Sequence, residues 1–417
     1  MKNKIRGLTA ILMASLLLLG LGGCASKSEG SPALDSGQEG VRVVGAQENT
    51  APDGTAFETV YVPDILEFDR PMNYPILFSS SPNGLYVRDM DDELYEFDAE
   101  GHFLRALGQV QFRCIAPDGT LWRLDGVENK GVPSDMHIDS SVYRQNDGGE
   151  TEILSFRTEQ GTADLTVTDK QLLIAKQYWD DNNTGHYSLE VYDTGGTLLH
   201  RQELSEWFQI RTDGAAVYFT GMDDYTTFAY DGESFALNKV DAVEEDCSLC
   251  GIHDGQLYLN DGVCVYRRAI GGTEREALFR YDEMYLSPQL APIPMGGSES
   301  FFFYDLRNQV SPYRLVRPVD KNSLPAERQT LVMAINEAVP EDYFNQYGRY
   351  RDAILDFNTV NRQYEIVVKN YADCENPQMA LNADIAAGAA PDLVDVSNFQ
   401  AGMVSSSNCE DLLPYFD

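Results

Sequence analysis

The chain has 417 residues, of which 66 are acidic and 31 basic, so its formal net charge is −35. This charge leaves no basic surface to neutralise phosphates, which argues against nucleic acid and anionic lipid as partners, and it disfavours acidic ligands. The five histidines are dispersed, and the sequence has neither a Gly-x-Ser-x-Gly motif nor a phosphate-binding glycine loop. We therefore expect a protein that is not an enzyme and that needs no cofactor or metal.

The first residues have the layout of a secretory signal: Lys2, Lys4 and Arg6, an uncharged apolar run over 8–21, and then Gly22-Gly23-Cys24. Leu21-Gly22-Gly23-Cys24 resembles the bacterial lipobox, which implies removal of residues 1–23 and attachment of lipid to Cys24. The expected location is the outer face of the cell membrane. An uncleaved anchor helix is the alternative, because the run approaches the roughly 17 residues that span a bilayer.

Residues 24–55 are rich in Ser, Gly, Pro and Glu and poor in large apolar side chains. This composition predicts a flexible tether between the lipid and the folded part.

Residues 56–322 consist of short runs that alternate apolar and polar side chains and are separated by Asp-Gly or Asn-Gly turns, a pattern typical of antiparallel strands. One turn-and-strand unit recurs, as in Asn83-Gly84-Leu85-Tyr86-Val87 and Asp254-Gly255-Gln256-Leu257-Tyr258. Its copies are anchored at Gly84, Gly119, Lys170, Gly214, Gly255 and Gly297, which are 35, 51, 44, 41 and 42 residues apart. The spacing is close to the period of four-stranded blades and predicts a β-propeller of six or seven blades. A pair of β-sandwiches or an irregular β-solenoid is the competing interpretation.

Two local patterns in this region suggest metal sites but are incomplete. Cys247 and Cys250 have the gap of a zinc or redox pair, yet no second pair lies at ligand spacing, so a local disulfide or simple burial is favoured. Asp89, Asp91, Asp92 and Glu93 lack the glycine and glutamate positions of a calcium loop. The other aspartates lie mostly in turns, where they cap the backbone.

After residue 322 the pattern changes to alternating strands and helices. We expect strands at Leu331–Ile335, Tyr364–Val368 and Leu393–Ser397, with helices over Tyr350–Asn358 and Met379–Ala387, the latter ended by Gly388. This order predicts the start of a doubly wound α/β lobe with a parallel sheet over residues 327–417.

Three motifs follow one another in this segment: Phe357-Asn358-x-x-Asn361, Ala387-Gly388-Ala389-Ala390-Pro391-Asp392-Leu393-Val394 and Glu410-Asp411-Leu412-Leu413-Pro414-Tyr415. Together with the lipobox, they resemble the family 1 extracellular solute-binding proteins of sugar-uptake ABC transporters. The resemblance covers about a fifth of the chain. It implies a two-lobed clamp that closes on a sugar or oligosaccharide and delivers it to ABC permease subunits in the membrane.

In α/β lobes, ligands bind beyond the carboxyl ends of the strands. The matching positions are Asn336 and Glu337 after the first strand, and Ser397, Asn398 and Phe399 after the third. A complete two-lobed binder needs on the order of 300 to 400 residues, so we expect this lobe to be truncated. Either the coding sequence is a fragment of a longer one, or the protein naturally retains only part of the lobe. The alternative function is a cell-surface propeller that binds a glycan or a partner protein and has no transport role.

Overall fold

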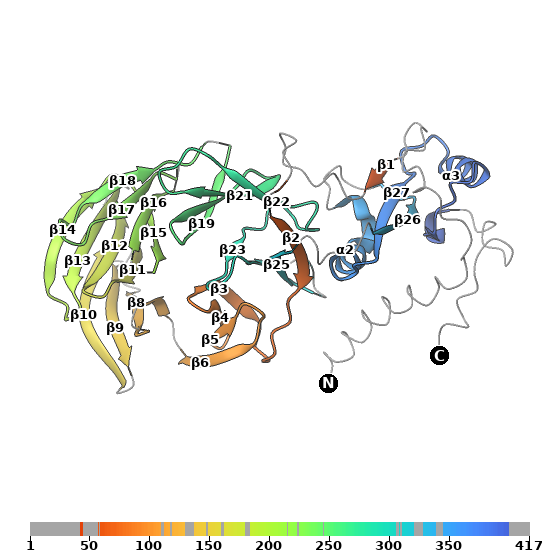
Figure 1. The fold of residues 1–417 in the computed structure, drawn as a ribbon. Helices are drawn as coiled ribbons and strands as arrows, with labels where there is room; N and C mark the ends of the chain where they lie inside the picture. Colours follow the sequence, from red (N-terminus) through yellow and green to blue (C-terminus); the bar gives the residue numbers. More distant parts are fainter. Residues whose placement is uncertain are drawn as a thin grey trace. The chain divides into compact units, whose positions relative to one another are not determined.

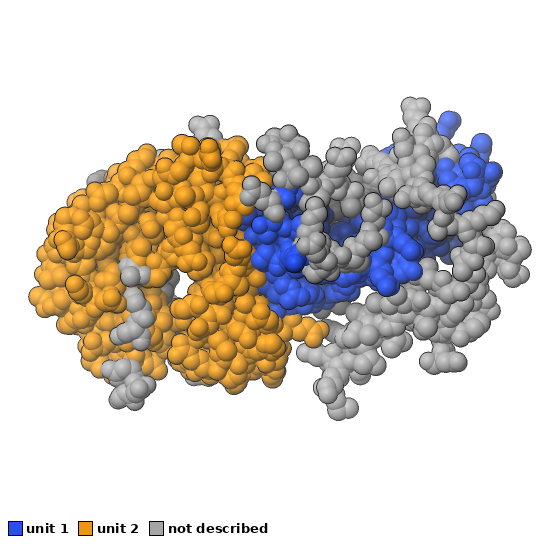
Figure 2. Space-filling model, viewed as in Figure 1, with its two compact units in different colours: residues 1–66, 278–290, 302–417 blue, residues 67–277, 291–301 orange. Residues whose placement is uncertain are grey.

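The computed structural model describes residues 42–44, 57, 59–109, 112–116, 119–129, 137–146, 149–159, 162–179, 184–214, 216–222, 225–244, 246–305, 308, 311–320, 328–338 and 345–399. The predicted signal segment, Cys24 and Cys409 lie outside these residues. The chain divides into two compact units, which Figure 2 shows in different colours. Unit 1 comprises residues 1–66, 278–290 and 302–417, and unit 2 comprises residues 67–277 and 291–301.

Six antiparallel sheets of four strands each make up a six-bladed β-propeller (Figure 1). Blade one contains β3 (Pro75–Ser81), β4 (Gly84–Asp89), β5 (Glu93–Asp98) and β6 (Phe103–Gln109). Blade two contains β7 (Phe112–Ile115), β8 (Leu121–Asn129), β9 (His137–Asn146) and β10 (Gly149–Glu159). Blade three contains β11 (Thr162–Val167), β12 (Gln171–Trp179), β13 (Gly185–Asp193) and β14 (Leu198–Leu204).

Blade four contains β15 (Phe208–Asp213), β16 (Ala216–Gly221), β17 (Thr227–Tyr230) and β18 (Leu237–Asp241). Blade five contains β19 (Ser248–His253), β20 (Gln256–Asn260), β21 (Cys264–Ala269) and β22 (Glu276–Arg280). Blade six contains β23 (Ile293–Pro294), β24 (Phe301–Tyr304), β25 (Tyr313–Val319) and, from the start of the described chain, β2 (Val60–Ile65). β2 pairs antiparallel with β25 from Val60↔Val319 to Ile65↔Arg314, so the last sheet is completed by an N-terminal strand.

The repeat seen in the sequence corresponds to one position in the fold. Five of the six anchors lie between the first and second strands of a blade, and the sixth, Gly84, is the first residue of the second strand. This agreement confirms the propeller, and the sheets give six as the number of blades. The turn glycines Gly119, Gly214, Gly255 and Gly297 have φ between +58° and +83°, a region that favours glycine. The 51-residue step arises in blade two, where β9 and β10 are 10 and 11 residues long.

The segment after the propeller forms a small sheet with three parallel strands. β26 (Gln329–Ile335) pairs with β27 (Tyr364–Asn370) on one side and with β28 (Leu393–Val394) on the other, both in parallel. β1 (Arg42–Val44) joins the far side of β27 in antiparallel orientation. A 3-10 helix, η4 (Asn345–Tyr350), and α2 (Arg351–Val360) lie between β26 and β27 in the sequence, and α3 (Pro377–Ala386) lies between β27 and β28. We call residues 328–399 the α/β segment.

The strand and helix order expected for the α/β segment is present, with one difference. The third strand was expected to reach Ser397, but β28 ends at Val394 and a 3-10 helix, η5 (Val396–Asn398), follows it. The reason is that Asp395 accepts the backbone N–H of Ser397 and turns the chain. A short parallel sheet of this kind occurs in many functional classes and does not by itself identify a solute-binding lobe.

Two of the motif residues hold the α/β segment together. Asn358 is buried and bonds the backbone of Ile366 in both directions, with Nδ2 donating at 2.9 Å and Oδ1 accepting at 2.8 Å. The carboxylate of Asp392 accepts the backbone N–H of Val332 at 2.8 Å. These contacts tie α2 to β27 and the start of β28 to β26, so these two motif residues have structural roles.

Blade six and the α/β segment share contacts inside unit 1. Tyr285, from the loop after β22, packs into the apolar core of the α/β segment with Leu331, Ile335 and Phe357. In addition, the buried guanidinium of Arg314 on β25 pairs with Asp356 of α2, whose carboxylate also accepts a hydrogen bond of 2.8 Å from Asn308. These residues form one continuous packed body.

Cys247 and Cys250 do not form the local disulfide that was one of the alternatives, and no disulfide occurs among the cysteines that the structure describes. Burial raises the pKa of Cys247 to about 11 and that of Cys250 to about 12. Both thiols therefore stay protonated at neutral pH. Among the described residues, none of the helices combines the length and apolar character of a membrane span.

Candidate functional site

Four of the five predicted ligand-binding residues lie together at the carboxyl edge of the parallel sheet. Asn336 and Glu337 directly follow β26, while Ser397 and Asn398 lie in η5, shortly after β28. The amide Nδ2 of Asn336 donates to the carbonyl oxygen of Asn398 at 2.7 Å, so the two loop ends are joined. This edge is where parallel α/β sheets bind ligands.

Arg349 of η4 stands at the centre of this edge and was not expected from the sequence. Its Nη2 donates to Asp395 Oδ2 at 2.7 Å and to the hydroxyl of Ser397, and its Nε lies 3.6 Å from Glu337 Oε2. The guanidinium side chain is 44% exposed, whereas the side chain of Asp395 is 4% exposed. We call Asn336, Glu337, Arg349, Asp395, Ser397 and Asn398 the sheet-edge cluster.

The backbone before Arg349 is shaped by a glycine. Gly348 has φ +59°, and a Cβ at this position would lie 2.7 Å from Glu337 Oε2. The backbone N–H of Arg349 donates to the same oxygen at 3.3 Å. The positive φ favours glycine here, and any side chain would also displace the Glu337 carboxylate.

The charge of Asp395 is stabilised by its neighbours. Burial opposes ionisation, but the hydrogen bonds from Ser397 and Tyr350 and the positive charge of Arg349 outweigh it and lower the pKa of Asp395 below its ordinary value. Burial, together with the charge and hydrogen bond of Asp395, raises the pKa of Tyr350. At neutral pH the Asp395 carboxylate of the cluster is therefore ionised, and the neighbouring Tyr350 phenol keeps its proton.

Phe399 lies apart from this cluster. Its side chain is 7% exposed and packs edge-on against Tyr371, with ring centroids 6.0 Å apart, in a small core that also contains Leu381. Its ring therefore fills the interior and is not presented at the edge. Asp395 lay in the middle of the expected strand Leu393–Ser397, and the strand-end rule reaches it only because β28 ends at Val394. Arg349 gave no signal in the sequence.

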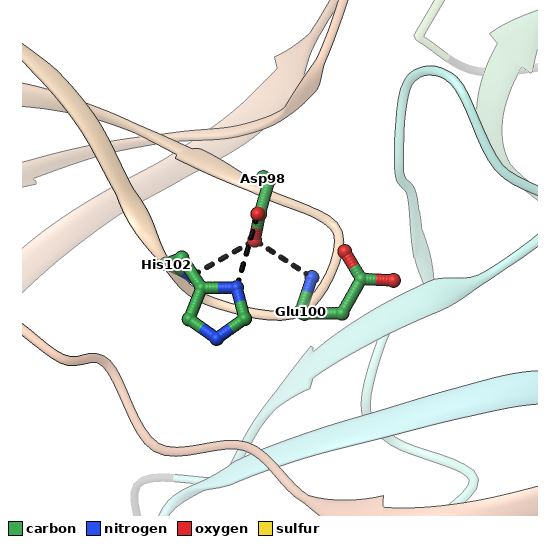
Figure 3. Close-up of side chains that lie close together, drawn as sticks. All are labelled: Asp98, Glu100 and His102. Atoms are coloured by element: carbon green, nitrogen blue, oxygen red, sulfur yellow. Dashed lines mark hydrogen bonds and ion pairs between the residues drawn. The ribbon is translucent and has the colours of Figure 1, made fainter.

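A competing polar group lies in the propeller, at the turn between β5 and β6. Figure 3 shows Asp98, Glu100 and His102 at this turn, where three potential metal ligands come close together. Asp98 Oδ1 accepts the backbone N–H groups of Glu100 and His102 at 3.0 and 2.8 Å, and Oδ2 lies 3.1 Å from His102 Nδ1. The carboxylate is thus used to close the turn, as expected of a turn aspartate.

The possible calcium loop at Asp89 has the same explanation. Asp89 is buried, and its carboxylate accepts the backbone N–H groups of Asn73, Asp91 and Glu93 at 3.0 to 3.1 Å. A second group of potential ligands, Asp213, His253 and Asp254, is organised by two backbone N–H groups that donate to Asp213. In these turns the carboxylates of Asp89 and Asp213 already accept hydrogen bonds from backbone N–H groups.

The sheet-edge cluster offers both donors and acceptors. The Ser397 hydroxyl donates to the Asp395 carboxylate and accepts from the Arg349 guanidinium. Amide, carboxylate and guanidinium groups from three segments are suited to hydrogen-bonding a polar ligand.

No protein-family model and no curated protein matches this chain. Solved structures resemble it in fold. The acylaminoacyl peptidase of Pyrococcus horikoshii is 12% identical, with a TM-score of 0.39 over 74% of this chain and 60% of that one. The soluble aldose sugar dehydrogenase of Escherichia coli is 11% identical, with a TM-score of 0.36 over 62% of this chain and 100% of that one.

The β-propeller domain of the Trilobed protease from Pyrococcus furiosus is 11% identical, with a TM-score of 0.36 over 61% of this chain and 100% of that one. At such identities the likeness concerns the propeller fold alone, and the activities of these proteins do not transfer to this chain. The peptidase match also leaves about two fifths of that chain uncovered. What is established is therefore a six-bladed β-propeller with an attached α/β segment.

Proposed function

We propose that this protein is a lipid-anchored extracellular solute-binding protein of an ABC-type uptake system, that it binds a carbohydrate at the sheet-edge cluster, and that it is not an enzyme. Its partners are then the solute and the permease subunits, and its place is the outer face of the cell membrane. The propeller is an accessory module in this scheme.

The observation that carries the proposal is the convergence of the sheet-edge cluster at the carboxyl ends of β26 and β28. Asp395 and Glu337 both point oxygens at Arg349, and Asn336 is held by Asn398. A neutral hydroxylated solute can exchange hydrogen bonds with such groups without having to neutralise a buried charge. The family resemblance of the surrounding motifs supports the same ligand class.

The test is calorimetric titration of the protein, expressed from its complete reading frame, with a panel of neutral mono- and oligosaccharides. Arg349→Gln and Asp395→Asn should each weaken the binding of a recognised sugar at least about tenfold, because each removes a charge-assisted contact. Arg351→Gln is the matched control, since it makes the same charge change two residues away and its partner is Asp352. Sugar binding that survives in both site variants would disprove the assignment of the site.

The lipid anchor is tested separately. Cys24→Ser should abolish incorporation of radiolabelled palmitate and release the protein from the membrane fraction. Continued labelling of the variant would show that Cys24 is not the attachment site.

A second function, recognition of a glycan or protein by the propeller itself, is favoured by an apolar surface on blade one. Tyr74 and Met90 are 58% and 61% exposed, and Ile76 and Leu77 of β3 are also exposed. The backbone N–H of Met90 donates to the carbonyl oxygen of Asn73 at 2.9 Å, which brings Tyr74 and Met90 to the same end of the blade. Large side chains gathered on a surface often mark a binding site.

The two functions are separated by the variants. On a glycan array, binding by the propeller should persist in Asp395→Asn and fall in a Tyr74→Ala/Met90→Ala variant. The opposite result favours the sheet-edge cluster.

A further inference from the structure

Arg211 holds an unusual positive charge inside the propeller. It lies on β15, the first strand of blade four, and β15 is packed beside β19, the first strand of blade five (Figure 1). Nη2 donates to Gln209 Oε1 at 2.8 Å, whereas Nε is buried and has no hydrogen-bond partner. Within the described part of the chain, no carboxylate forms an ion pair with Arg211.

Two buried arginines of this protein are neutralised. Arg268, which is 5% exposed, donates to Asp241 at 2.6 Å and to Glu244 at 2.7 Å. Arg314 is paired with Asp356.

Arg144 on β9, like Arg211, has a buried Nε without a hydrogen-bond partner, but its guanidinium lies 5.9 Å from the ring centroid of Trp122. Within the described residues, Arg211 has neither a carboxylate partner nor such a ring contact, and a largely buried guanidinium is costly to leave without either.

Among the residues that the structure describes, the surroundings of Arg211 carry hydrogen-bonding groups but no free carboxylate. Thr220, which faces Gln209 across the strand pair, has a buried hydroxyl without a partner. Cys250 lies at a bulge in the pairing of β19 with β20, and Cys250 and Tyr225 are the groups that interact electrostatically with Arg211. Burial raises the pKa of Cys250 to about 12, so its thiol stays protonated and does not neutralise the guanidinium. Asp213, two residues along β15, is already bonded to the backbone N–H groups of Asp254 and Gly255.

We propose that Arg211, with Gln209, Thr220 and Tyr225, forms a binding site between blades four and five for the oxyanion group of a small ligand: a carboxylate, sulfate or phosphate. A guanidinium matches such groups in geometry and charge. Ordered water can satisfy Nε and the Thr220 hydroxyl, but it does not neutralise the charge. This site is independent of the sheet-edge cluster and does not depend on the proposed transport function.

The experiment measures anion binding to the whole chain. Thermal unfolding is followed in low-millimolar sodium acetate, sulfate or phosphate and compared with sodium chloride at equal ionic strength, for the unchanged protein and for Arg211→Met, Arg211→Lys and Arg157→Gln. Arg157 is the control because its guanidinium is 59% exposed and pairs with Asp139 at the surface. The anion that raises the melting temperature most identifies the preferred ligand class: acetate indicates a planar carboxylate, and sulfate or phosphate indicates a tetrahedral oxyanion.

At least one of the three anions should raise the melting temperature above that in chloride, in the unchanged protein and in Arg157→Gln. The shift should vanish in Arg211→Met. In Arg211→Lys the anion should bind at least about tenfold more weakly, because lysine keeps the positive charge but lacks the planar N–H donors of the guanidinium. Arg211→Lys also covers the case in which Arg211→Met fails to fold. The same shift in Arg211→Met, or no shift in the unchanged protein, would overturn the proposal.

Discussion

The aspartates of two propeller turns and two aspartates of the α/β segment differ in their partners: the former accept local backbone hydrogen bonds, and the latter form ion pairs with arginines distant in sequence. Asp98 and Asp193 accept backbone N–H groups from residues two and four positions further along the chain, at 2.8 to 3.0 Å. Asp356 and Asp395, by contrast, pair with arginines 42 and 46 residues away. The first kind closes a turn, and the second kind joins elements that are distant in sequence.

This difference explains why a strongly acidic chain offers so few candidate sites. A carboxylate in a hairpin turn is already engaged by the local backbone, so its presence says little about ligands. A carboxylate that pairs with an arginine from another secondary-structure element holds several loops together. The loss of stability caused by a substitution should therefore differ between the two kinds of aspartate, both in magnitude and in pH dependence.

The largest effect is expected from Arg314→Met, which leaves Asp356 buried without its cation. Loss of one partner from a buried ion pair costs about 3 to 5 kcal/mol, and burial already raises the pKa of Asp356 despite the nearby charge of Arg314. Urea unfolding followed by circular dichroism measures the change. The control is Arg317→Met, which breaks the exposed pair with Asp64 and should cost less than about 1 kcal/mol. Equal effects would mean that Arg314 is no more important than a surface residue.

A smaller effect, about 2 kcal/mol, is expected from Asp395→Asn at neutral pH, because the variant weakens hydrogen bonds to a charged acceptor. The pKa of Asp395 is lowered in the folded protein. Its contribution is therefore present above the ordinary carboxyl pKa of about 4 and is lost as the pH falls through the lower, folded value. Melting temperatures of the two proteins should converge as the pH is taken from 7 to 3, and a constant difference would contradict this.

The hairpins were predictable from the sequence because their signals are local. Gly119, Gly214 and Gly255 each mark a turn whose geometry depends on a few neighbouring residues. The sheet edge was predictable for Asn336 and Ser397 because Asn336 directly follows one expected strand and Ser397 ends another. The number of residues between anchors also reflected the blade period, with the long hairpin of blade two as the one large deviation.

Arg349, Tyr285 and Arg211 were not predictable, because their roles depend on contacts between residues far apart in the chain. Tyr285 belongs to a propeller loop by sequence, yet its hydroxyl accepts a hydrogen bond from Arg328 at the start of the α/β segment. No periodicity or motif encodes such a pairing. The same reason accounts for Phe399, which follows a strand end like Ser397 but turns into the core.

For the turns, Asp98→Ala should cost about 1 kcal/mol, the typical value of the hydrogen bonds that it removes. Glu100→Ala is the control, since only the backbone N–H of Glu100 takes part in the turn and the variant keeps it. The melting temperatures of Asp98→Ala, Glu100→Ala and the unchanged protein are compared in the presence of a chelator. If added zinc stabilises the unchanged protein and the stabilisation disappears in Asp98→Ala, the turn is a metal site and its interpretation as a backbone cap is wrong.

The smallest effect is expected from Asp231→Asn, at the turn after β17. The Asp231 carboxylate accepts the hydroxyl of Ser234 at 2.7 Å and the backbone N–H of Glu233 at 2.9 Å, and these bonds lower its pKa. An asparagine keeps one acceptor oxygen for the backbone N–H of Glu233, and its amide can donate to the Ser234 hydroxyl oxygen in place of the second carboxylate oxygen. The melting temperature at pH 7 should therefore not change measurably, whereas Asp231→Ala should lower it. A clear loss in Asp231→Asn would show that the charge itself matters at an exposed turn. The contrast with Asp395, where the charge holds a distant arginine, would then no longer separate the two regions.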